Sequence, residues 1–512
     1  MRSSATPATD PEVVVIGAGP SGLFAAAELA RHGVVARVLD RLPAPHHQTR
    51  ATAIQPGTLE LLARAGLVED VLAASVHVRF ARVVDADLKQ VSELPYAGIG
   101  CPWEFQCSLP QWRTEQILTE RLAELGVVVE RGVAASSIEE RDDGVLIRLE
   151  RDDGTSTAVE AAWVIGAGGA HSIMRASMAE TLEGFTYPGT VLAADVRVRC
   201  GLAHDASNMV ATPDGFVLLA PLPDDRWLTF VGVLDDDELA HLTRTNPAEV
   251  VAAGISRRIA ADVAVEDVGW ATSFRMHQRV VPRLAEGRRF LLGDAGHLSS
   301  PFGGEGLNAG LHDAQDIAWK LALAVHGHGR PALLESFEIE RLAADHHVLE
   351  VSGRIDGMVR AAVEAARTGV GASPATPAQR TAMARSRCLL DITYAGSPLV
   401  GEHLGSGVQL PDLPGPGERF PGRTTLTGTA HHLLIFGTAD AAGVERLHRR
   451  WRGLVDVVRS TDGPPVASGA LLVRPDGHVG FRATPADAAG LAALDAFLDS
   501  YLIPDRDPVE NG

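Results

Sequence analysis

The segment Val13-Val14-Val15-Ile16-Gly17-Ala18-Gly19-Pro20-Ser21-Gly22-Leu23-Phe24-Ala25-Ala26-Ala27 decides the fold of this chain. Its β-branched start, glycine-rich middle and alanine-rich end predict a strand, a tight turn and a helix in that order. In such a turn Gly17 permits the sharp bend, Gly19 lets a pyrophosphate approach the backbone, and Gly22 lets the helix pack close to the strand. Free N–H groups at the start of the helix then face the phosphates.

A second predicted strand, Val34-Val35-Ala36-Arg37-Val38-Leu39-Asp40, ends in an acid. The acid lies about twenty residues past the turn, where a carboxylate can hold the hydroxyl groups of a ribose. Strand, turn, helix, strand and acid in this order predict a dinucleotide site. The motif by itself leaves NAD and FAD open.

Composition narrows the class of partner. The 512 residues carry a net charge of -19, which disfavours nucleic acid and anionic lipid, so we expect a small-molecule partner. The four cysteines show neither a C-x-x-C pair nor metal-ligand spacing, so we expect no metal site and no redox thiol. Residues 1–11 are expected to be a flexible end, not a signal peptide. We expect a cytoplasmic protein without a membrane segment.

The rest of the chain predicts an α/β protein of three parts. Residues 12–185 and 275–400 form a discontinuous nucleotide-binding domain, to which the buried strand before Asp294 returns the chain. Residues 186–274 contain strand after strand with one helix, which predicts an inserted antiparallel sheet able to roof a pocket. Residues 401–512 follow as a separate small α/β domain.

A resemblance emerges past the middle of the chain. Gly293-Asp294-Ala295-Gly296-His297, residues 300–308 and residues 313–322 together look like the second FAD motif of the single-component flavoprotein aromatic hydroxylases. This family is also called the class A FAD monooxygenases, and the nearest in kind tailor aromatic polyketides. Further blocks in family order are Arg50-Ala51, Gln111, residues 164–175, Glu340-Arg341 and Arg474-Pro475-Asp476-Gly477.

The resemblance implies a fold and an assembly. It implies a Rossmann-like FAD-binding domain, an inserted substrate sheet of the p-hydroxybenzoate hydroxylase kind, and a thioredoxin-like C-terminal domain. Because residues 401–512 lack C-x-x-C, that domain cannot perform dithiol exchange and is expected to be structural or to support dimerisation. We therefore expect a monomer or homodimer.

The resemblance also assigns cofactor contacts. Asp40 would hold the adenosine ribose, Arg50 and Gln111 the pyrophosphate, ribityl chain or ring edge, and Asp294 the ribityl chain. The flavin ring would lie against Pro301, Gly303 and Gly304, which form the expected catalytic environment without a side-chain base. The full expected cofactor set is Gly17, Gly19, Pro20, Ser21, Gly22, Asp40, Arg41, Arg50, Gln111, Asp294, Pro301, Gly303, Gly304, Gly306, Leu307 and Asn308.

The residues themselves agree with this assignment at the glycine loop. A loop that enters a long helix near Leu307 aims N–H groups and the positive helix end at one spot. A reduced flavin is anionic at N1 and C2=O, so such a spot stabilises the charge as it develops.

The implied reaction uses three reactants. NAD(P)H reduces FAD, O2 adds at C4a, and the hydroperoxide passes one oxygen atom to an electron-rich phenolic carbon. The protein orients the aromatic substrate and excludes water. Candidate substrate contacts, each of which can also be a core residue, are Phe216, Leu218, Trp227, Phe230, Phe274, Met276 and His277.

Two departures and several alternatives remain. Family members usually have Asp-Gly where this chain has Gly168-Gly169, which affects the expected use of NAD(P)H. They often have a proline where this chain has Ser300, which is expected to loosen the loop beside the flavin ring. A Baeyer–Villiger or ring-rearranging flavin oxygenase stays open, as does a non-catalytic protein that binds flavin or an aromatic ligand. A flavin halogenase lacks its W-x-W-x-I-P segment here, and a nicotinamide dehydrogenase leaves the Asp294 block unexplained.

Overall fold

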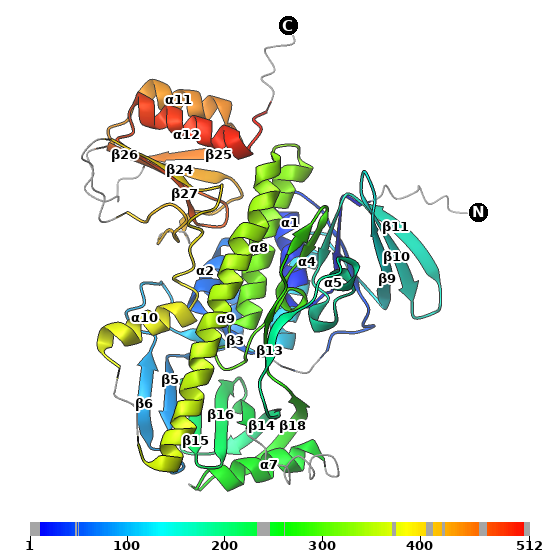
Figure 1. Ribbon diagram of the computed structural model, residues 1–512, viewed down its shortest axis with the longest axis vertical. Coiled ribbons are helices and arrows are strands. Elements are labelled where there is room, and N and C mark those ends of the chain that lie inside the picture. The colour runs from blue at the N-terminus through cyan, green and yellow to red at the C-terminus, as the bar shows by residue number, and fades with distance from the viewer. Residues whose placement is uncertain are drawn as a thin grey trace.

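The structure is a computed structural model that describes residues 11–46, 49, 51–232, 246–260, 262–370, 375–405, 413–421, 425–459 and 468–505. A central α/β core lies between a seven-stranded sheet and a smaller C-terminal domain (Figure 1). The long helix α9 (Pro331–Thr368) runs from the C-terminal domain to the seven-stranded sheet. At 1.5 Å per residue its 38 residues span about 57 Å.

The core sheet has the order β20-β21-β12-β1-β2-β8. All neighbours from β21 to β8 pair in parallel, whereas β20 pairs antiparallel with β21. The strands are β1 (Val13–Ile16), β2 (Arg37–Asp40), β8 (Val129–Arg131), β12 (Trp163–Gly166), β20 (Ala285–Glu286) and β21 (Arg289–Leu291). The predicted glycine turn, second strand and returning strand before Asp294 are therefore confirmed as neighbours in one sheet.

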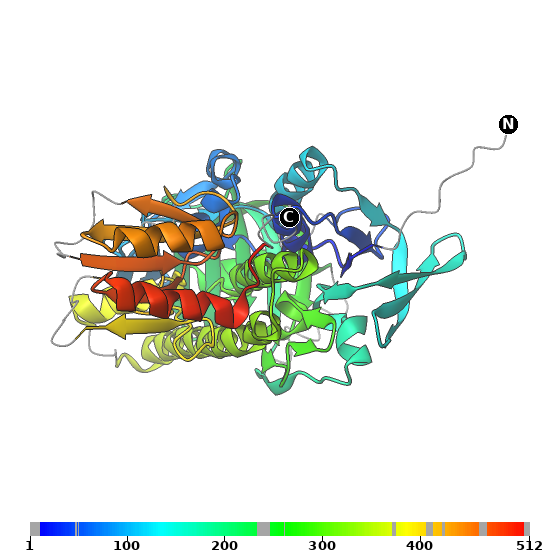
Figure 2. The same ribbon diagram turned by 90° about the horizontal axis from the view of Figure 1, so that it is seen from above.

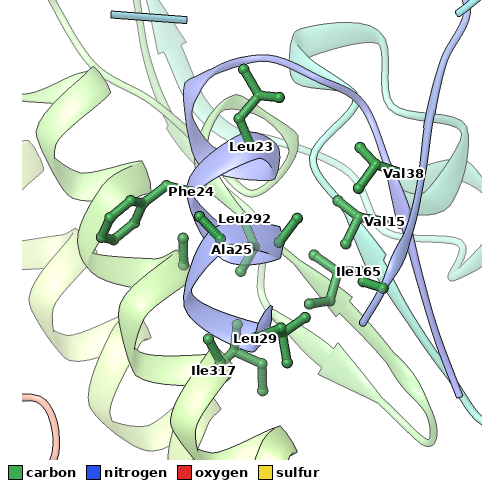
Figure 3. Close-up of a cluster of buried hydrophobic side chains, with 14 of the residues drawn as sticks. Val15, Leu23, Phe24, Ala25, Leu29, Val38, Ile165, Leu292 and Ile317 are labelled. Atoms are coloured by element: carbon green, nitrogen blue, oxygen red, sulfur yellow. The ribbon is translucent and has the colours of Figure 1, made fainter. Parts of the chain in front are cut away.

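Helix α1 (Pro20–Arg31) packs between this sheet and α8 (Gly306–Val325). Figure 3 shows Phe24 and Leu29 of α1 beside α8, with Val15, Val38 and Ile165 on the strands. All of these side chains are buried in one hydrophobic core. Burial of each stabilises the fold by roughly 1.5–3 kcal/mol, so this packing fixes the turn before α1 against the start of α8.

The seven-stranded sheet has the order β18-β14-β17-β16-β15-β5-β6. Its strands are β5 (Phe80–Val84), β6 (Gln90–Pro95), β14 (Val191–Arg199), β15 (Ala206–Thr212), β16 (Gly215–Leu222), β17 (Arg226–Gly232) and β18 (Ala264–Phe274). One face packs on α9, and the opposite face packs on α7 (Pro247–Arg258). The expected inserted sheet is present, but β5 and β6 come from within residues 12–185, and β15 pairs parallel with β5. The sheet is therefore mixed, not purely antiparallel.

Smaller elements connect these layers. Three-stranded sheets are formed by β3 (Ala53–Ile54), β7 (Gln106–Ser108) and β4 (Val76–Val78), by β9 (Val133–Glu140), β10 (Val145–Arg151) and β11 (Ser156–Ala161), and by β13 (Glu183–Thr186), β19 (His277–Val280) and β22 (His297–Leu298). The other helices are α2 (Pro56–Arg64), α3 (Val68–Ala74), α4 (Gln111–Glu124), α5 (Ile173–Ser177) and α10 (Pro377–Arg387), with single 3-10 turns η1 (Gly169–His171) and η2 (Gly293–Ala295).

The C-terminal domain is a five-stranded sheet of order β23-β27-β26-β24-β25 with two helices. Its elements are β23 (Gly401–Leu404), β24 (His431–Gly437), α11 (Ala441–Arg450), β25 (Val455–Arg459), β26 (Ser468–Val473), β27 (Val479–Thr484) and α12 (Ala488–Tyr501). The strand, helix, strand order followed by a hairpin and a helix is the expected thioredoxin-like arrangement. Figure 2 shows this domain and the β9–β11 sheet on opposite sides of the core.

None of the helices in the described residues combines the length and the apolar composition that a membrane-spanning segment needs.

Candidate functional site

Two adjoining cavities lie along the junction of these parts. The outer cavity, of about 650 Å³, is lined by the end of β2 and the turn after β1, and the inner cavity, of about 350 Å³, by the start of α8 and the seven-stranded sheet. Both cavities are lined by Gly19, Gln111, Ala167 and Gly169, so they form one cleft. The cleft has the size expected of a site for a large organic cofactor.

The three glycines of the first turn meet the three geometric demands placed on them. Gly17 has a positive φ of 111°, and a Cβ there would lie 2.3 Å from the Ala167 carbonyl oxygen. A Cβ at Gly22 would lie 1.9 Å from the Gly17 oxygen, so only glycine permits this contact. At Gly19, by contrast, a Cβ would meet no protein atom within 4 Å and would point into open space. Gly19 is therefore the glycine that leaves room for a ligand.

Asp40 lies at the outer end of the cleft. Its Oδ2 accepts the Ala18 N–H at 2.6 Å and its Oδ1 accepts the Leu42 N–H at 2.7 Å. These bonds fix the carboxylate beside the turn, and each oxygen keeps a lone pair for a hydroxyl group. Asp40 and Arg41 line the outer cavity together with Gly17.

Asp294 lies at the opposite end, in η2, where it is exposed and lines the inner cavity with Pro20 and Ser21. The two distant segments meet directly here, because a Cβ at Gly293 or Gly310 would lie 2.7 or 2.3 Å from Ser21 Oγ. Asp294 thus lines the same cavity as the turn after β1.

A buried ion cluster supports the Asp294 turn from behind. Asp313 Oδ2 accepts the Gly293 N–H at 2.9 Å and the His297 Nε2 hydrogen at 2.8 Å, and its Oδ1 accepts Arg341 Nε at 2.8 Å. Burial lowers the pKa of His297, but the charges of Asp345 and Asp313 outweigh it and raise the pKa to about 9. The raised pKa favours the protonated form of this buried histidine, which supports the turn through Asp313.

We expect this histidine to make stability depend on pH. A pKa raised in the folded state stabilises the protein fully below the unfolded value near 6.5, and the contribution is lost as pH rises through about 9. The melting temperature of the wild type should fall by on the order of several degrees more than that of His297→Gln between neutral pH and pH 10. Parallel melting curves of the two proteins over this range would contradict the assignment.

The glycine loop before α8 is pinned by side-chain hydrogen bonds. Asn308 Nδ2 donates to the Ala53 and Gly304 carbonyl oxygens at 2.8 and 2.6 Å, and Gln55 Nε2 donates to the Gly303 oxygen at 3.0 Å. Gly304 has a positive φ of 71°, and a Cβ there would lie 2.6 Å from Ala53 Cβ. The loop is therefore a fixed wall of the inner cavity.

Glu305, the N-cap of α8, is an acid that the sequence interpretation passed over as a loop residue. It is fully buried, and neither carboxylate oxygen has a hydrogen-bond partner among the residues that the structure describes. Burial raises its pKa to about 7, which the charge of Arg387 only partly offsets. Glu305 is therefore a titratable group beside the N-terminus of α8, the helix end that carries the expected partial positive charge.

The predicted cofactor residues fall into three groups by position. Most line the cleft: Gly17, Gly19, Pro20, Ser21, Asp40, Arg41, Gln111, Asp294, Pro301, Gly303, Gly304, Gly306 and Leu307. Gly22 and Asn308 do not line it and instead set the turn and the loop. Arg50 lies outside the described residues. Gly168 lines the outer cavity, and a Cβ there would meet its nearest atom at an ordinary 3.7 Å, so packing does not exclude the usual aspartate.

The predicted substrate contacts are divided by the alternation of strand faces. Leu218 and Phe230 line the inner cavity, whereas Trp227 points to the α7 side and packs on His204 at 4.2 Å. Trp227 and Phe230 lie three residues apart in β17, so their side chains point to opposite faces of the sheet. Leu228 points to the same face as Phe230 and lines the inner cavity.

The other candidates do not line either cavity. Phe216 packs on the wall residue Phe302 at 4.9 Å, Phe274 packs on Phe230 at 6.0 Å, and Met276 accepts a weak bond from Ser300. His277 bonds Thr186 at 2.9 Å.

The polar residues of the inner cavity that were not predicted include Gln106 of β7, Ser207 of β15 and Arg387 of α10. Gln106 accepts a hydrogen bond from the Tyr96 hydroxyl at 3.1 Å. Arg387 is the one cation among the described residues that line this cavity. They come from three separate segments, so no local motif marks them.

The cleft fits FAD. A pyrophosphate requires open space and free N–H groups, which Gly19 and the uncapped start of α1 offer. The ribose and the ribityl chain require hydrogen-bond acceptors, which the acids at the two ends of the cleft offer. The fixed glycine loop lines the inner cavity, where the sequence predicts the flavin ring.

Comparison with known proteins agrees with this geometry. Residues 10–352 match the FAD binding domain family and residues 403–502 the aromatic-ring hydroxylase C-terminal family. The chain is 33% identical to 6-methylpretetramide 4-monooxygenase of Streptomyces rimosus, covering 97% of this chain and 95% of that protein.

Solved structures show the same likeness. Anhydrotetracycline hydroxylase from Streptomyces rimosus matches with a TM-score of 0.75 and 29% identity over 97% of this chain and 100% of that one. The ternary complex of aklavinone-11 hydroxylase with FAD and aklavinone matches with a TM-score of 0.79 and 25% identity over 96% and 99% of the two chains. The chain is an enzyme with FAD as its cofactor, and it belongs to the family of FAD-dependent aromatic monooxygenases.

Proposed function

We propose that this enzyme hydroxylates a phenolic or quinonoid polycyclic aromatic of the polyketide type, with NAD(P)H as reductant and O2 as oxygen donor. The observation that carries the proposal is the inner cavity, where an apolar sheet wall of Leu218, Leu228 and Phe230 faces the glycine loop. The relatives named above act on, or are solved with, multi-ring aromatic compounds of this kind. We further propose a cytoplasmic monomer or homodimer without nucleic-acid or membrane partners.

The residues of the chain bind and orient the substrate. The apolar wall packs on the ring faces and keeps water out, while Gln106, Ser207 and Arg387 face the polar ring substituents. When FAD is bound between Asp40 and Asp294, it supplies the redox chemistry that the family resemblance implies. No side-chain base is assigned.

The test is substrate-stimulated turnover. Enzyme loaded with FAD is supplied with NADH or NADPH and with anhydrotetracycline or other polycyclic phenols under labelled O2. We expect an aromatic to stimulate nicotinamide oxidation and one labelled oxygen atom to enter a ring carbon. A lactone product identifies the Baeyer–Villiger alternative, and a lack of stimulation by every aromatic ligand favours the non-catalytic binder.

Asp294 provides a more specific prediction. Asp294→Ala should weaken FAD binding by roughly 10-fold or more, because a charged hydrogen-bond acceptor contributes about 1.5–3 kcal/mol. Flavin fluorescence titration of the apoprotein measures the change. Asp153→Ala, in the exposed turn between β10 and β11, is the control and should leave the affinity unchanged. Equal FAD affinities of the Asp294 variant and the wild type would contradict the assignment of Asp294 to the FAD site.

A further inference from the structure

Glu305 is a buried acid that the proposed reaction does not use. It is fully buried at the start of α8, and both of its oxygens lack a hydrogen-bond partner within the described part of the chain. Buried carboxylates are ordinarily paired or bonded, because desolvation of an unpaired charge is costly. Glu305 therefore stands apart from the bonded acids around it, such as Asp313.

The carboxyl group lies directly behind the loop that walls the inner cavity. A Cβ at Gly303 would lie 1.7 Å from Oε2 and 1.9 Å from Oε1, so the carboxyl group packs against the Gly303 backbone. Gly303, Gly304 and Gly306 line the cavity, whereas Glu305 itself does not. Only one thickness of backbone thus separates Glu305 from the expected position of the flavin ring.

The charged and titratable groups that act on Glu305 are few. The charge of Arg387 in α10 lowers the pKa of Glu305. The charge of Glu305 in turn raises the pKa of Tyr96 and that of Cys388. Burial outweighs the charge of Arg387 and raises the pKa to about 7. Neither Glu305 oxygen accepts a hydrogen bond from Arg387, and the backbone N–H of Glu305 itself lowers the pKa less than the charge of Arg387 does.

We propose that Glu305 takes up a proton from solvent when FAD is reduced and releases it when FAD is oxidised again. Negative charge that arrives across the loop disfavours the ionised carboxylate, so reduction raises the affinity of Glu305 for a proton. Two electrons and one proton produce the anionic reduced flavin, and the second proton forms an O–H bond on Glu305. The inference rests on the FAD site and not on the identity of the aromatic substrate.

The first test is the midpoint potential of FAD-loaded protein, reduced electrochemically without substrate across pH 6–9. Above pH 7, the slope of potential against pH should be up to about twofold steeper in the wild type than in Glu305→Gln, because two protons instead of one accompany two electrons. Below pH 7 the slopes should converge. Glu28→Gln is the matched control, since Glu28 is also buried but bonded to Arg31, and it should keep the wild-type slope.

A second measurement detects the protonated carboxyl group directly. The reduced-minus-oxidised infrared spectrum of the wild type at pH 8 should gain a protonated-carboxyl C=O band, which Glu305→Gln should lack. Parallel potential slopes in the wild type and Glu305→Gln, or no such band in the wild type, overturn the inference and leave the proposed hydroxylation standing. Normal proton coupling without aromatic-stimulated turnover overturns the hydroxylation alone.

Discussion

Arg474→Met should destabilise the enzyme by about 3–5 kcal/mol, which is the usual cost of breaking a fully buried ion pair by removal of one partner. Arg474 lies in the C-terminal domain but donates to both Glu340 oxygens of α9, at 2.6 and 2.7 Å. It also donates to Asp476, and its guanidinium lies 5.5 Å from the Trp319 ring centroid. Without it, Glu340 is left buried with Lys320 as its remaining cationic contact, and Asp476 is left buried beside the His478 ring at 3.4 Å.

The matched control is Arg450→Met in α11 of the same domain. Arg450 bonds Asp495 and Asp499 at 3.0 and 2.6 Å and stacks on Trp451, but its side chain is 38% exposed. Exposed pairs contribute about 0–1 kcal/mol, so this variant should remain close to the wild type. Urea unfolding measures both changes, and Arg474→Lys should lie between them because it keeps the charge without the bidentate contact. Equal losses at Arg474 and Arg450 would contradict a special role for the buried pair.

Gly19→Val should fold but bind FAD at least about 100-fold more weakly, a loss of roughly 2.7 kcal/mol. A Cβ at Gly19 would meet no protein atom within 4 Å, so the valine side chain should occupy only the space in which we expect the pyrophosphate to bind. Fluorescence titration measures FAD affinity, and circular dichroism of the apoprotein shows whether the fold is kept.

Gly22→Ala is the contrasting variant. Its Cβ would lie 1.9 Å from the Gly17 oxygen, so it should destabilise the apoprotein itself. If Gly19→Val instead unfolds the apoprotein while Gly22→Ala leaves it stable, the roles assigned to the two glycines are wrong.

Local chemistry explains why much of the site could be predicted. The spacing of Gly17, Gly19 and Gly22 within one short turn marks them in the sequence, although the atom closest to a Cβ at Gly17 belongs to the distant Ala167. The acid at Asp40 follows from the parallel order of two adjacent strands. Asp294 was found because a recognisable block surrounds it. Gly17, Gly19, Asp40 and Asp294 line the cleft, and Gly22 sets the turn beside it.

Long-range packing explains what the sequence did not reveal. Arg387 enters the inner cavity from α10, and Glu305 becomes buried only because Gly303 and the segment around Arg387 close over it. The position of Trp227 could have been predicted from the sequence, because residues three apart in a strand point to opposite faces of the sheet. Trp227 therefore faces away from the side on which Phe230 lies.

The composition of the seven-stranded sheet bears on how such enzymes can be recombined. Strands β5 and β6 come from residues 80–95, and β5 joins the sheet through β15, the strand that places Ser207 in the inner cavity. A chimaera that exchanges only residues 186–274 would seat a donor β15 against the recipient's β5 and mismatch their shared hydrogen-bonded edge. A graft intended to transfer substrate preference has to carry both segments together.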